Sequence, residues 1–424
     1  MNTTHPSVCI VGGGLAGLVA AAKLARAGHP VTLVEAGTRL GGRAVTDDLD
    51  GYLLNLGPHA LYRKGVGERV LHSLGVRTQG GVPKPAGSLI RDGALHALPA
   101  GAGSLLGTTA LRVGQRFALG AALTRLLAMR ATSATGSTDA LLRRLTSDPD
   151  VRAVLEATVR VATYAHCPEL LPASVALQQV QAAVRHSVTY LDGGWQQLVD
   201  QLAETARAAG ASLRVGARVT AVRRGEVHLG EEVVSADQIV LAVPPEVTGT
   251  LLARWEEAAT SLKQSLEPMG PPVRAACLDV ALSSLPSPKR TLALGFDEPL
   301  YISVHTESAK LAPEGGAVLH AALYLPPSPT RRPREDRAVL EEALDLVQPG
   351  WREVVVTQRF LPRMVVVSAL PPASGLAGRP DVQSVPGLWL AGDWVGATGF
   401  LVEGSLASGA EVADRIAGLA VAAA

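Results

Sequence analysis

Three glycines near the start of the chain, Gly12, Gly14 and Gly17, have the spacing GxGxxG. In such a motif the first glycine permits a tight turn, the second lets the backbone approach a pyrophosphate, and the third lets a helix pack closely on a strand. Glu35 follows roughly 20 residues later, where a carboxylate accepts hydrogen bonds from ribose hydroxyls and repels a 2′-phosphate. These residue types at this spacing predict a dinucleotide-binding site.

The surrounding sequence supplies the elements that such a site needs. Val8–Val11 is a short apolar run typical of a buried parallel strand, and Leu15–Ala27 has helical periodicity up to Gly28. Val31–Val34 is the next expected strand. The helix would present free N–H groups and a partial positive charge to the phosphates. The cofactor contacts expected here are Gly12, Gly14, Leu15, Ala16, Gly17, Glu35 and Ala36.

Composition narrows the class of protein. A chain of 424 residues exceeds the usual size of one hydrophobic core, so two domains are expected. Lys plus Arg number 39 and Asp plus Glu number 38, which gives no electrostatic case for nucleic-acid binding. The cysteines, Cys9, Cys167 and Cys277, lack the spacing of a metal site or a disulfide framework. We therefore expect small-molecule chemistry without a metal, in a reducing cytoplasm.

Membrane association is expected to be peripheral at most, because no uncharged apolar run approaches the ~18 residues of a spanning helix. The apolar stretch from residue 98 to 129 looks helical and carries Arg112, Arg116 and Arg125. It is interpreted as a helical cap over the site, with contact to a membrane surface as the alternative. The Pro- and Arg-rich stretch 326–337 is predicted to be a surface connector.

Two further motifs carry a family resemblance. Arg39-x-Gly41-Gly42-Arg43 continues the glycine motif, and Gly387-Leu-Trp-Leu-Ala-Gly392-Asp393-Trp394 ends an apolar run near the C-terminus. In these motifs the chain resembles the superfamily of flavin amine oxidases, protoporphyrinogen oxidases and phytoene desaturases. The resemblance is greatest to the phytoene-desaturase-like bacterial oxidoreductases, and it implies FAD as the cofactor. Because no cysteine follows Cys277, FAD is expected to be noncovalent.

The resemblance also assigns roles to individual residues. Gly42 and Arg43 would lie at the pyrophosphate, and the segment Gly57-Pro58-His59 would pass beside the isoalloxazine ring. The backbone at Val219 would meet the adenine. Gly392 and Asp393 would bind the ribityl or phosphate region, and a helix starting near Leu401 would stabilise negative charge at the pyrimidine edge of the flavin.

The fold class implied is a mixed α/β and α+β chain. A Rossmann-like FAD domain would be discontinuous, built from residues 1–75, 186–250 and 381–424. The inserted residues 76–185 and 251–380 would form a substrate domain of a mixed sheet plus helices, including a helical cap.

Substrate choice must come from the inserted domain. In amine oxidases that resemble this chain, a lysine on a substrate-domain strand holds a water at the flavin, and two aromatic rings flank the amine. Here Arg274 is nearest to the lysine's place, and Arg is a poor proton acceptor. Phe400 could be one ring, but no aromatic side chain between residues 371 and 388 could be the other. An apolar, isoprenoid-like substrate is therefore expected.

The catalytic candidates are His59, whose ordinary pKa suits acid or base work, and Arg274. The substrate-binding candidates are Tyr62, Tyr301, His305, Trp394 and Phe400. For Tyr62, Tyr301 and His305, a packed core residue is the alternative interpretation, and for His59 it is a packed or cofactor-contacting residue.

The expected reaction is dehydrogenation by hydride transfer to FAD, with dioxygen or a quinone taking the electrons, since a second dinucleotide motif is not visible. The enzymatic alternative is an amine oxidase or a protoporphyrinogen oxidase. An alternative of another class is a non-redox escort protein for prenylated partners, which has a similar fold.

Overall fold

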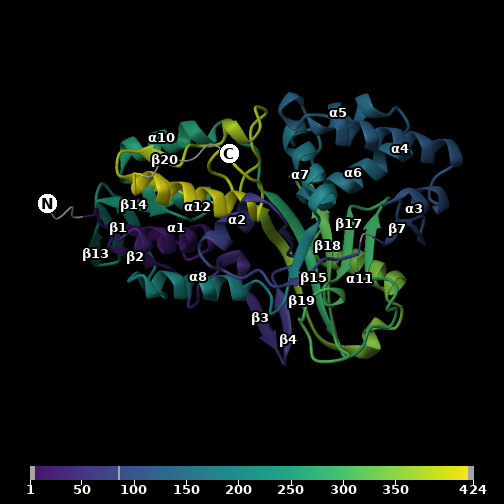
Figure 1. The fold of residues 1–424 in the computed structure, drawn as a ribbon, viewed down its shortest axis with the longest axis horizontal. Coiled ribbons are helices and arrows are strands. Elements are labelled where there is room, and N and C mark those ends of the chain that lie inside the picture. The colour runs from purple at the N-terminus through teal and green to yellow at the C-terminus, as the bar shows by residue number, and fades with distance from the viewer. Residues whose placement is uncertain (1–4, 85, 419–424) are drawn as a thin grey trace.

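The computed structural model describes residues 5–84 and 86–418, which form two lobes (Figure 1). The first lobe is built on a six-stranded sheet and the second on a seven-stranded sheet. The helices α3 to α7 lie together above the second sheet, at the upper right of the view.

The sheet of the first lobe collects strands from three distant parts of the chain. Its central strand, β1 (Val8–Val11), pairs in parallel with β2 (Val31–Val34) and with β14 (Gln238–Leu241). The predicted strands Val8–Val11 and Val31–Val34 are confirmed. The complete order is β10 (Ser212–Arg214), β2, β1, β14, β21 (Leu388–Leu390) and β20 (Gln383–Val385).

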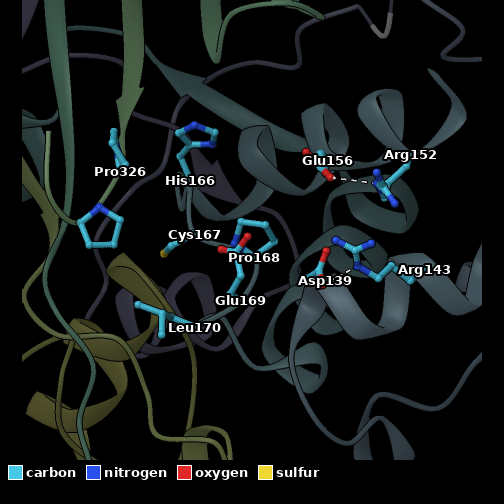
Figure 2. Close-up of a pocket in the computed structure, with 11 residues that line it drawn as sticks. Asp139, Arg143, Arg152, Glu156, His166, Cys167, Pro168, Glu169, Leu170 and Pro326 are labelled. Atoms are coloured by element: carbon cyan, nitrogen blue, oxygen red, sulfur yellow. Dashed lines mark hydrogen bonds and ion pairs between the residues drawn. The ribbon is translucent and has the colours of Figure 1, made fainter. Parts of the chain in front are cut away.

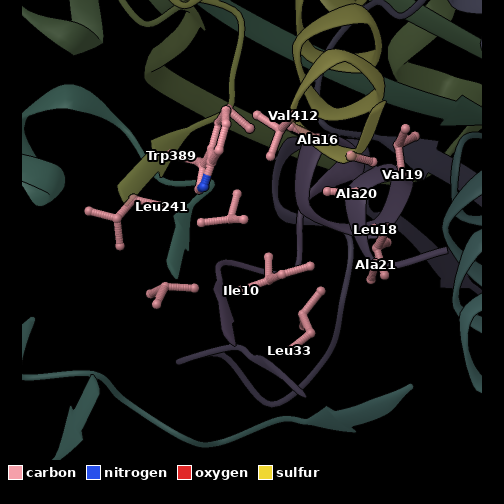
Figure 3. Packing of buried hydrophobic residues seen from close by; sticks show 14 of the residues in the cluster. Ile10, Ala16, Leu18, Val19, Ala20, Ala21, Leu33, Leu241, Trp389 and Val412 are labelled. Carbon is pink, nitrogen blue, oxygen red and sulfur yellow. The ribbon is translucent and has the colours of Figure 1, made fainter. Parts of the chain in front are cut away.

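Small side chains let helices approach this sheet closely. The helix α1 (Leu15–Arg26) packs beside α12 (Val402–Ile416) and α8 (Gln196–Ala208). Ten of its twelve residues are buried, because it is covered on several sides. Figure 3 shows the resulting core, in which Ile10 and Leu33 from the sheet meet side chains of α1 and Val412 of α12.

The second sheet contains both parallel and antiparallel pairs, as predicted. The strands β16 and β7 pair in parallel, and the other neighbouring pairs are antiparallel. The order is β19 (Val355–Val367), β15 (Val273–Leu282), β18 (Ala317–Leu325), β17 (Leu300–Val304), β16 (Leu292–Gly295), β7 (Ser88–Arg91) and β8 (Ala94–Ala97).

Alternation along β15 assigns the two faces of this sheet. Leu278 and Val280 pack in one cluster with the helix α11 (Pro333–Val347). Ala275 and Cys277 point the other way, into a cluster with the helices above. The second face is therefore covered by α3 (Ala102–Gly107), α4 (Val113–Ala128), α5 (Thr138–Leu145), α6 (Pro149–Thr163) and α7 (Ala173–His186).

Two predictions for the second lobe need adjustment. The stretch 98–129 is helical, but in two pieces, α3 and α4, separated by residues 108–112. The prediction of a connector over 326–337 is wrong in its second half, because α11 begins at Pro333. Proline suits that first helical position because its missing N–H would have no intrahelical partner there.

The remaining elements join the lobes or extend them. The helix α2 (Val66–Ser73) contacts α12, and β9 (Val188–Leu191) pairs with both β5 (Leu61–Tyr62) and β6 (Gly80–Gly81). Short hairpins and helices complete the set: β3 (Thr46–Leu49), β4 (Tyr52–Asn55), β11 (Ala221–Arg223), β12 (Glu226–Leu229), β13 (Glu232–Ser235), α9 (Pro245–Leu252) and α10 (Glu256–Leu266).

The domain boundaries remain a prediction, but packing bears on one of them. The strands of the six-stranded sheet lie between residues 8–34, 212–241 and 383–390. Side chains of α9 and α10, including Leu252 and Leu262, belong to the core of this lobe. The expected boundary at 250/251 therefore falls within a segment that packs as one piece with the first lobe.

Across residues 5–84 and 86–418, every helix is too short or too polar to cross a bilayer. The same residues bring together no group of three or more His, Cys, Asp or Glu side chains suited to a metal ion.

Candidate functional site

A cavity of about 1420 Å³ opens between the two lobes and collects most of the predicted site. It is lined by residues from the glycine motif, from the segment after β4, and from the turn that precedes α12. Predicted residues that line it are Gly12, Gly14, Leu15, Ala16, Glu35, Ala36, Gly42, Arg43, Pro58, His59, Tyr62, Arg274, Tyr301, Gly392, Asp393, Trp394 and Leu401. Those that do not are Gly17, Gly57, Val219, His305 and Phe400.

The glycine motif has the geometry that its three roles require. Gly12 has φ +108°, and a Cβ there would lie 2.5 Å from the Ala242 carbonyl oxygen. A Cβ on Gly17 would lie 2.1 Å from the Gly12 oxygen, so Gly17 brings helix and strand together without itself reaching the cavity. Around Gly14 a Cβ would meet no heavy atom within 4 Å. Gly14 therefore leaves the cavity open where α1 begins.

Glu35 is held in place by two backbone amides. The Gly13 N–H donates to one carboxylate oxygen and the Gly37 N–H donates to the other, both at 2.7 Å. Each oxygen keeps a lone pair for another donor. The carboxylate is thus fixed at the end of β2, on the cavity wall, where ribose hydroxyls could reach it.

Arg43 and Asp393, from the two motifs that carry the family resemblance, meet in space. The Arg43 guanidinium donates to Asp393 Oδ2 at 3.0 Å, and the Ser368 N–H donates to the same oxygen at 2.9 Å. Burial raises the pKa of the Asp393 carboxyl, but Arg43 and Ser368 outweigh it and hold that pKa below its ordinary value. The other oxygen, Oδ1, is buried without a hydrogen-bond partner within the described part of the chain.

The helix α12 begins at the cavity, as predicted. Leu401, Val402 and Ser405 line the wall, so the first turn presents its free N–H groups there. Leu401 has φ +56°, a conformation that costs a non-glycine residue about 1–3 kcal/mol. Such strain is concentrated at functional sites, where surrounding structure maintains it.

His59 lies on the wall with its ring packed edge-on against Trp195, at 4.9 Å between ring centres. Its Nδ1 is 3.0 Å from the Gly57 carbonyl oxygen and its Nε2 is 3.0 Å from that of Arg43. Burial lowers the pKa of His59 to about 4, although both carbonyls oppose this. The ring is therefore neutral near pH 7 and donates to one of the two carbonyls.

The far half of the cavity is apolar. It extends between α4, α6 and α7, which contribute aliphatic side chains from three directions. These residues are Leu123, Leu127, Val154, Val161, Ala162, Val180, Ala183 and Val184. Arg274, which the resemblance places nearest to the family's lysine, lines the same cavity from β15.

Two substrate-binding candidates lie behind the wall instead of on it. Phe400 is 1 % exposed and packs among Val273, Val367 and Leu370 in the helical core. His305 is buried against Tyr190, with ring centres 3.9 Å apart. His305 is therefore a packed core residue, which was the alternative interpretation of this position.

Sequence reasoning missed several wall residues. Tyr164, Tyr190, Trp195 and Ser303 line the cavity. Tyr190 follows two β-branched residues, so the sequence indicates a strand there. The sequence does not indicate which strands pair around it and bring it to Ser303. Asp279 and His320 are buried opposite each other on β15 and β18. They lie too far apart in the sequence for this contact to be predicted from it.

A smaller cleft of about 390 Å³ lies apart from this site (Figure 2). Four of its charged side chains form two pairs, Arg143 with Asp139 at 2.7 Å and Arg152 with Glu156 at 3.6 Å, and Glu169 lies beside them. None of the predicted site residues lines this cleft, so it is not the candidate site.

The large cavity fits the FAD that the resemblance implies. The start of α1 and the open space at Gly14 suit a pyrophosphate, and the fixed Glu35 carboxylate suits ribose hydroxyls. The unpartnered Asp393 Oδ1 suits a hydroxyl donor of the ribityl chain. The residues present can therefore hold the pyrophosphate, the ribose and the ribityl chain of the cofactor.

Comparison with known proteins gives the family. The family described as "Flavin containing amine oxidoreductase" matches residues 15–276, more than half of the chain. An L-amino-acid oxidase of Naja atra is 52 % identical over 63 residues, which are 14 % of this chain and 12 % of that protein. A coproporphyrinogen III oxidase of Propionibacterium freudenreichii subsp. freudenreichii is 36 % identical over 113 residues, 25 % of this chain and 21 % of that protein. These matches thus span only about an eighth to a fifth of each relative.

A solved structure extends the likeness in fold over the whole chain. An oxidoreductase from Methanosarcina mazei superposes with a TM-score of 0.76 at 18 % identity, covering 96 % of this chain and 99 % of that one. Together with the cavity, the family match supports an FAD-dependent oxidoreductase over the non-redox alternative. The chain belongs to the flavin containing amine oxidoreductase family.

Proposed function

We propose that this protein dehydrogenates a C–C or C–X bond in an apolar, isoprenoid-like molecule, with noncovalent FAD. The observation that carries the proposal is the apolar half of the cavity between α4, α6 and α7. An aliphatic wall binds an apolar chain by removing it from water, and this is worth roughly 25 cal/mol per Å² of buried apolar surface. A small charged amine would find little there to pair with.

The chain's own residues would bind and orient the substrate. Bound FAD supplies the acceptor for the hydride that leaves the substrate carbon. The aliphatic helices exclude water, and His59, neutral near pH 7, is a base or hydrogen-bonding group on the wall. The first turn of α12 offers N–H groups and a positive dipole end, which favour negative charge at that edge of the site.

Noncovalent attachment is supported by the positions of the cysteines. Cys9, Cys167 and Cys277 are all buried, and none lines the large cavity. A thioether to the cofactor would need a cysteine on that wall. The final electron acceptor is proposed to be dioxygen or a quinone.

An amine oxidase or a porphyrinogen oxidase is the second candidate. It is favoured by the names of the relatives matched, an L-amino-acid oxidase and a coproporphyrinogen III oxidase. Against an amine substrate, Arg274 faces the cavity where the family's lysine would stand, and Phe400 is packed behind the wall. The apolar substrate is therefore preferred.

Anaerobic reduction of the bound flavin tests the choice. Purified protein loaded with FAD would be mixed without oxygen with an isoprenoid, an amino acid, an amine and a porphyrinogen in turn. We expect the yellow colour to bleach with the isoprenoid and to persist with the others. Bleaching by the amino acid, amine or porphyrinogen alone would assign the second candidate instead.

We further propose a cytoplasmic location with peripheral contact to a membrane through α3 and α4. Leu106, Val113 and Phe117 on these helices are exposed, and Phe117 is 66 % exposed. No acidic residue occurs between Asp92 and Asp139, whereas four arginines do. Apolar side chains beside arginines suit a bilayer with anionic headgroups.

A further inference from the structure

One corner of the cavity is polar. It is made of three hydroxyl groups, those of Tyr190 on β9 and of Tyr301 and Ser303 on β17. The three residues are buried, and all of them line the cavity. The Tyr190 oxygen lies 3.0 Å from the Tyr301 oxygen and 3.0 Å from the Ser303 oxygen. We call this group the hydroxyl cluster.

The hydroxyl cluster has hydrogen-bonding capacity to spare. Its two hydrogen bonds use two of the three hydroxyl protons. Burial raises the pKa of Tyr190 and of Tyr301, so both phenols stay protonated and remain donors at neutral pH. A buried donor without an acceptor is unfavourable, and a ligand oxygen in the cavity would satisfy it.

The cluster is held rigidly from behind. The His305 ring stacks on the Tyr190 ring at 3.9 Å and an interplanar angle of 13°. The His305 ring in turn meets that of His320, whose Nδ1 lies 2.6 Å from Asp279 Oδ1. Because β17 and β18 place Ser303 opposite His320, the hydroxyls sit on the same braced part of the sheet. Because the side chains are already held in place, little free energy is lost in ordering them when a ligand binds.

The chemistry of the cluster selects the type of oxygen. Burial lowers the pKa of His305 well below its ordinary value, so the ring beneath Tyr190 is uncharged. The Arg359 guanidinium behind it is paired with Asp279 at 2.8 Å and contributes no free positive charge. Lys84 and Glu307, which also line the cavity, pair with each other at 3.5 Å, and Glu307 is close enough to add to the effect of burial in raising the pKa of Tyr190. A carboxylate on the ligand would therefore meet no free cation here, whereas an uncharged carbonyl, hydroxyl or ether oxygen needs none.

From this geometry we infer that the hydroxyl cluster is a recognition site for one uncharged oxygen on an otherwise apolar substrate. The inference rests on the apolar substrate proposed above and narrows it to an oxygen-bearing molecule. Tyr190, Tyr301 and Ser303 would set specificity and register along the cavity, while the hydride transfer occurs elsewhere on the chain of the substrate.

Two matched isoprenoids test the inference by equilibrium binding. Farnesal carries an aldehyde oxygen and farnesene carries none, and their dissociation constants would be measured on FAD-loaded protein through the fluorescence of Trp195 and the other tryptophans. The ratio of the two constants is compared between variants, so that the different water solubilities of the probes cancel. We expect Tyr301→Phe and Ser303→Ala each to reduce the preference for farnesal by about tenfold, the effect of one hydrogen bond.

Tyr52→Phe is the matched control. Tyr52 is 7 % exposed and does not line the cavity, so removal of its hydroxyl should not change the ratio. If both probes bind and the ratio stays the same in Tyr301→Phe and Ser303→Ala, the inference is overturned and the proposed function stands. If farnesoate, the carboxylate, binds more tightly than farnesal, the uncharged oxygen is wrong. If no probe binds the wild-type protein, the apolar substrate itself is overturned, and the inference with it.

Discussion

Glu35 and Asp393 show how single carboxylates are prepared for a cofactor before it binds. Glu35 is oriented by two backbone amides, and Asp393 is oriented by Arg43 and the Ser368 amide. In both cases protein donors set the direction of the carboxylate and leave acceptor capacity toward the cavity. Little rotamer freedom is then lost on binding.

Replacing Glu35 should weaken FAD binding without unfolding the protein. Glu35→Ala removes a charged hydrogen-bond acceptor, and such a bond is worth about 1.5–3 kcal/mol, so the dissociation constant for FAD should rise at least about tenfold. It would be measured by titrating apoprotein with FAD and following flavin fluorescence. Glu231→Ala, at an exposed turn, is the control. Equal affinities in the two variants would contradict the assignment of Glu35 to the ribose.

His59 is predicted to act in turnover rather than in cofactor retention. His59→Gln keeps a hydrogen-bonding group but removes the base, and general acid–base groups contribute about 10²–10⁴-fold to rate. We expect kcat to fall by about a hundredfold while the protein stays yellow. His228→Gln, on the hairpin strand β12, controls for the substitution itself. Unchanged kcat would remove His59 from the catalytic residues.

The pH dependence of the same reaction follows from the environment of His59. Because burial lowers its pKa to about 4, His59 is already neutral at pH 5 and above. Its contribution to kcat should therefore be constant from about pH 5 upward and should fall only in more acid solution. The pH profiles of the wild-type protein and His59→Gln, measured on the same substrate, give this contribution as their ratio. A ratio that titrates near pH 6.5 would place His59 in water-like surroundings.

Among the elements, the contact of α1 with α12 depends on one glycine. A Cβ on Gly409 would lie 2.3 Å from the Ala16 carbonyl oxygen, which is backbone and cannot move aside. Gly409→Val should destabilise the apoprotein by about 3 kcal/mol through overpacking. Gly114→Val in α4 has open space around its Cβ and should change stability by less than about 0.5 kcal/mol. Thermal denaturation of both variants measures these changes. Equal stabilities of the two variants would show that α12 does not pack closely against α1 at Gly409.

Local sequence was sufficient for the elements that follow from short-range patterns. The apolar runs at β1 and β2, the stop of α1 before Gly28 and the start of α12 near Leu401 were all predictable, because periodicity and glycine placement determine them. The cofactor half of the site followed from the same motifs. Long-range pairing was not predictable: Tyr190 reaches Ser303 only because β9 and β17 meet through the tertiary fold. Phe400 was expected at the substrate because it lies where the family resemblance puts one aromatic ring, but it packs in the helical core.

On the scale of the whole molecule, three of the ten large exposed apolar residues in the described part of the chain, Leu106, Val113 and Phe117, lie on α3 and α4. Phe117 lies on α4 at one end of the view, whereas β13 lies at the other end (Figure 1). The end with α3 and α4 also carries the stretch without acidic residues. The proposed membrane contact is therefore made by one end of the molecule, on helices whose other side lines the cavity through Leu123 and Leu127.

Sedimentation with lipid vesicles tests this contact. The wild-type protein should pellet with vesicles containing phosphatidylglycerol and should be released at high salt, because the attraction of arginines to anionic lipid is screened. Phe117→Glu should reduce the pelleted fraction severalfold. Val233→Glu, at a 44 % exposed position on β13, should not. A wild-type protein that stays in the supernatant, or two variants that behave alike, would show that α3 and α4 do not contact lipid.

The three-part origin of the first sheet has a consequence for biosynthesis. Strand β1 and the glycine motif leave the ribosome early, but Asp393 and the first turn of α12 come from the last tenth of the sequence, and β14 and β21 are needed to join them. N-terminal segments ordinarily begin to fold first during synthesis. Here the early segments must wait with an incomplete sheet, so we expect the cofactor to be captured only after β21 and α12 have been synthesised.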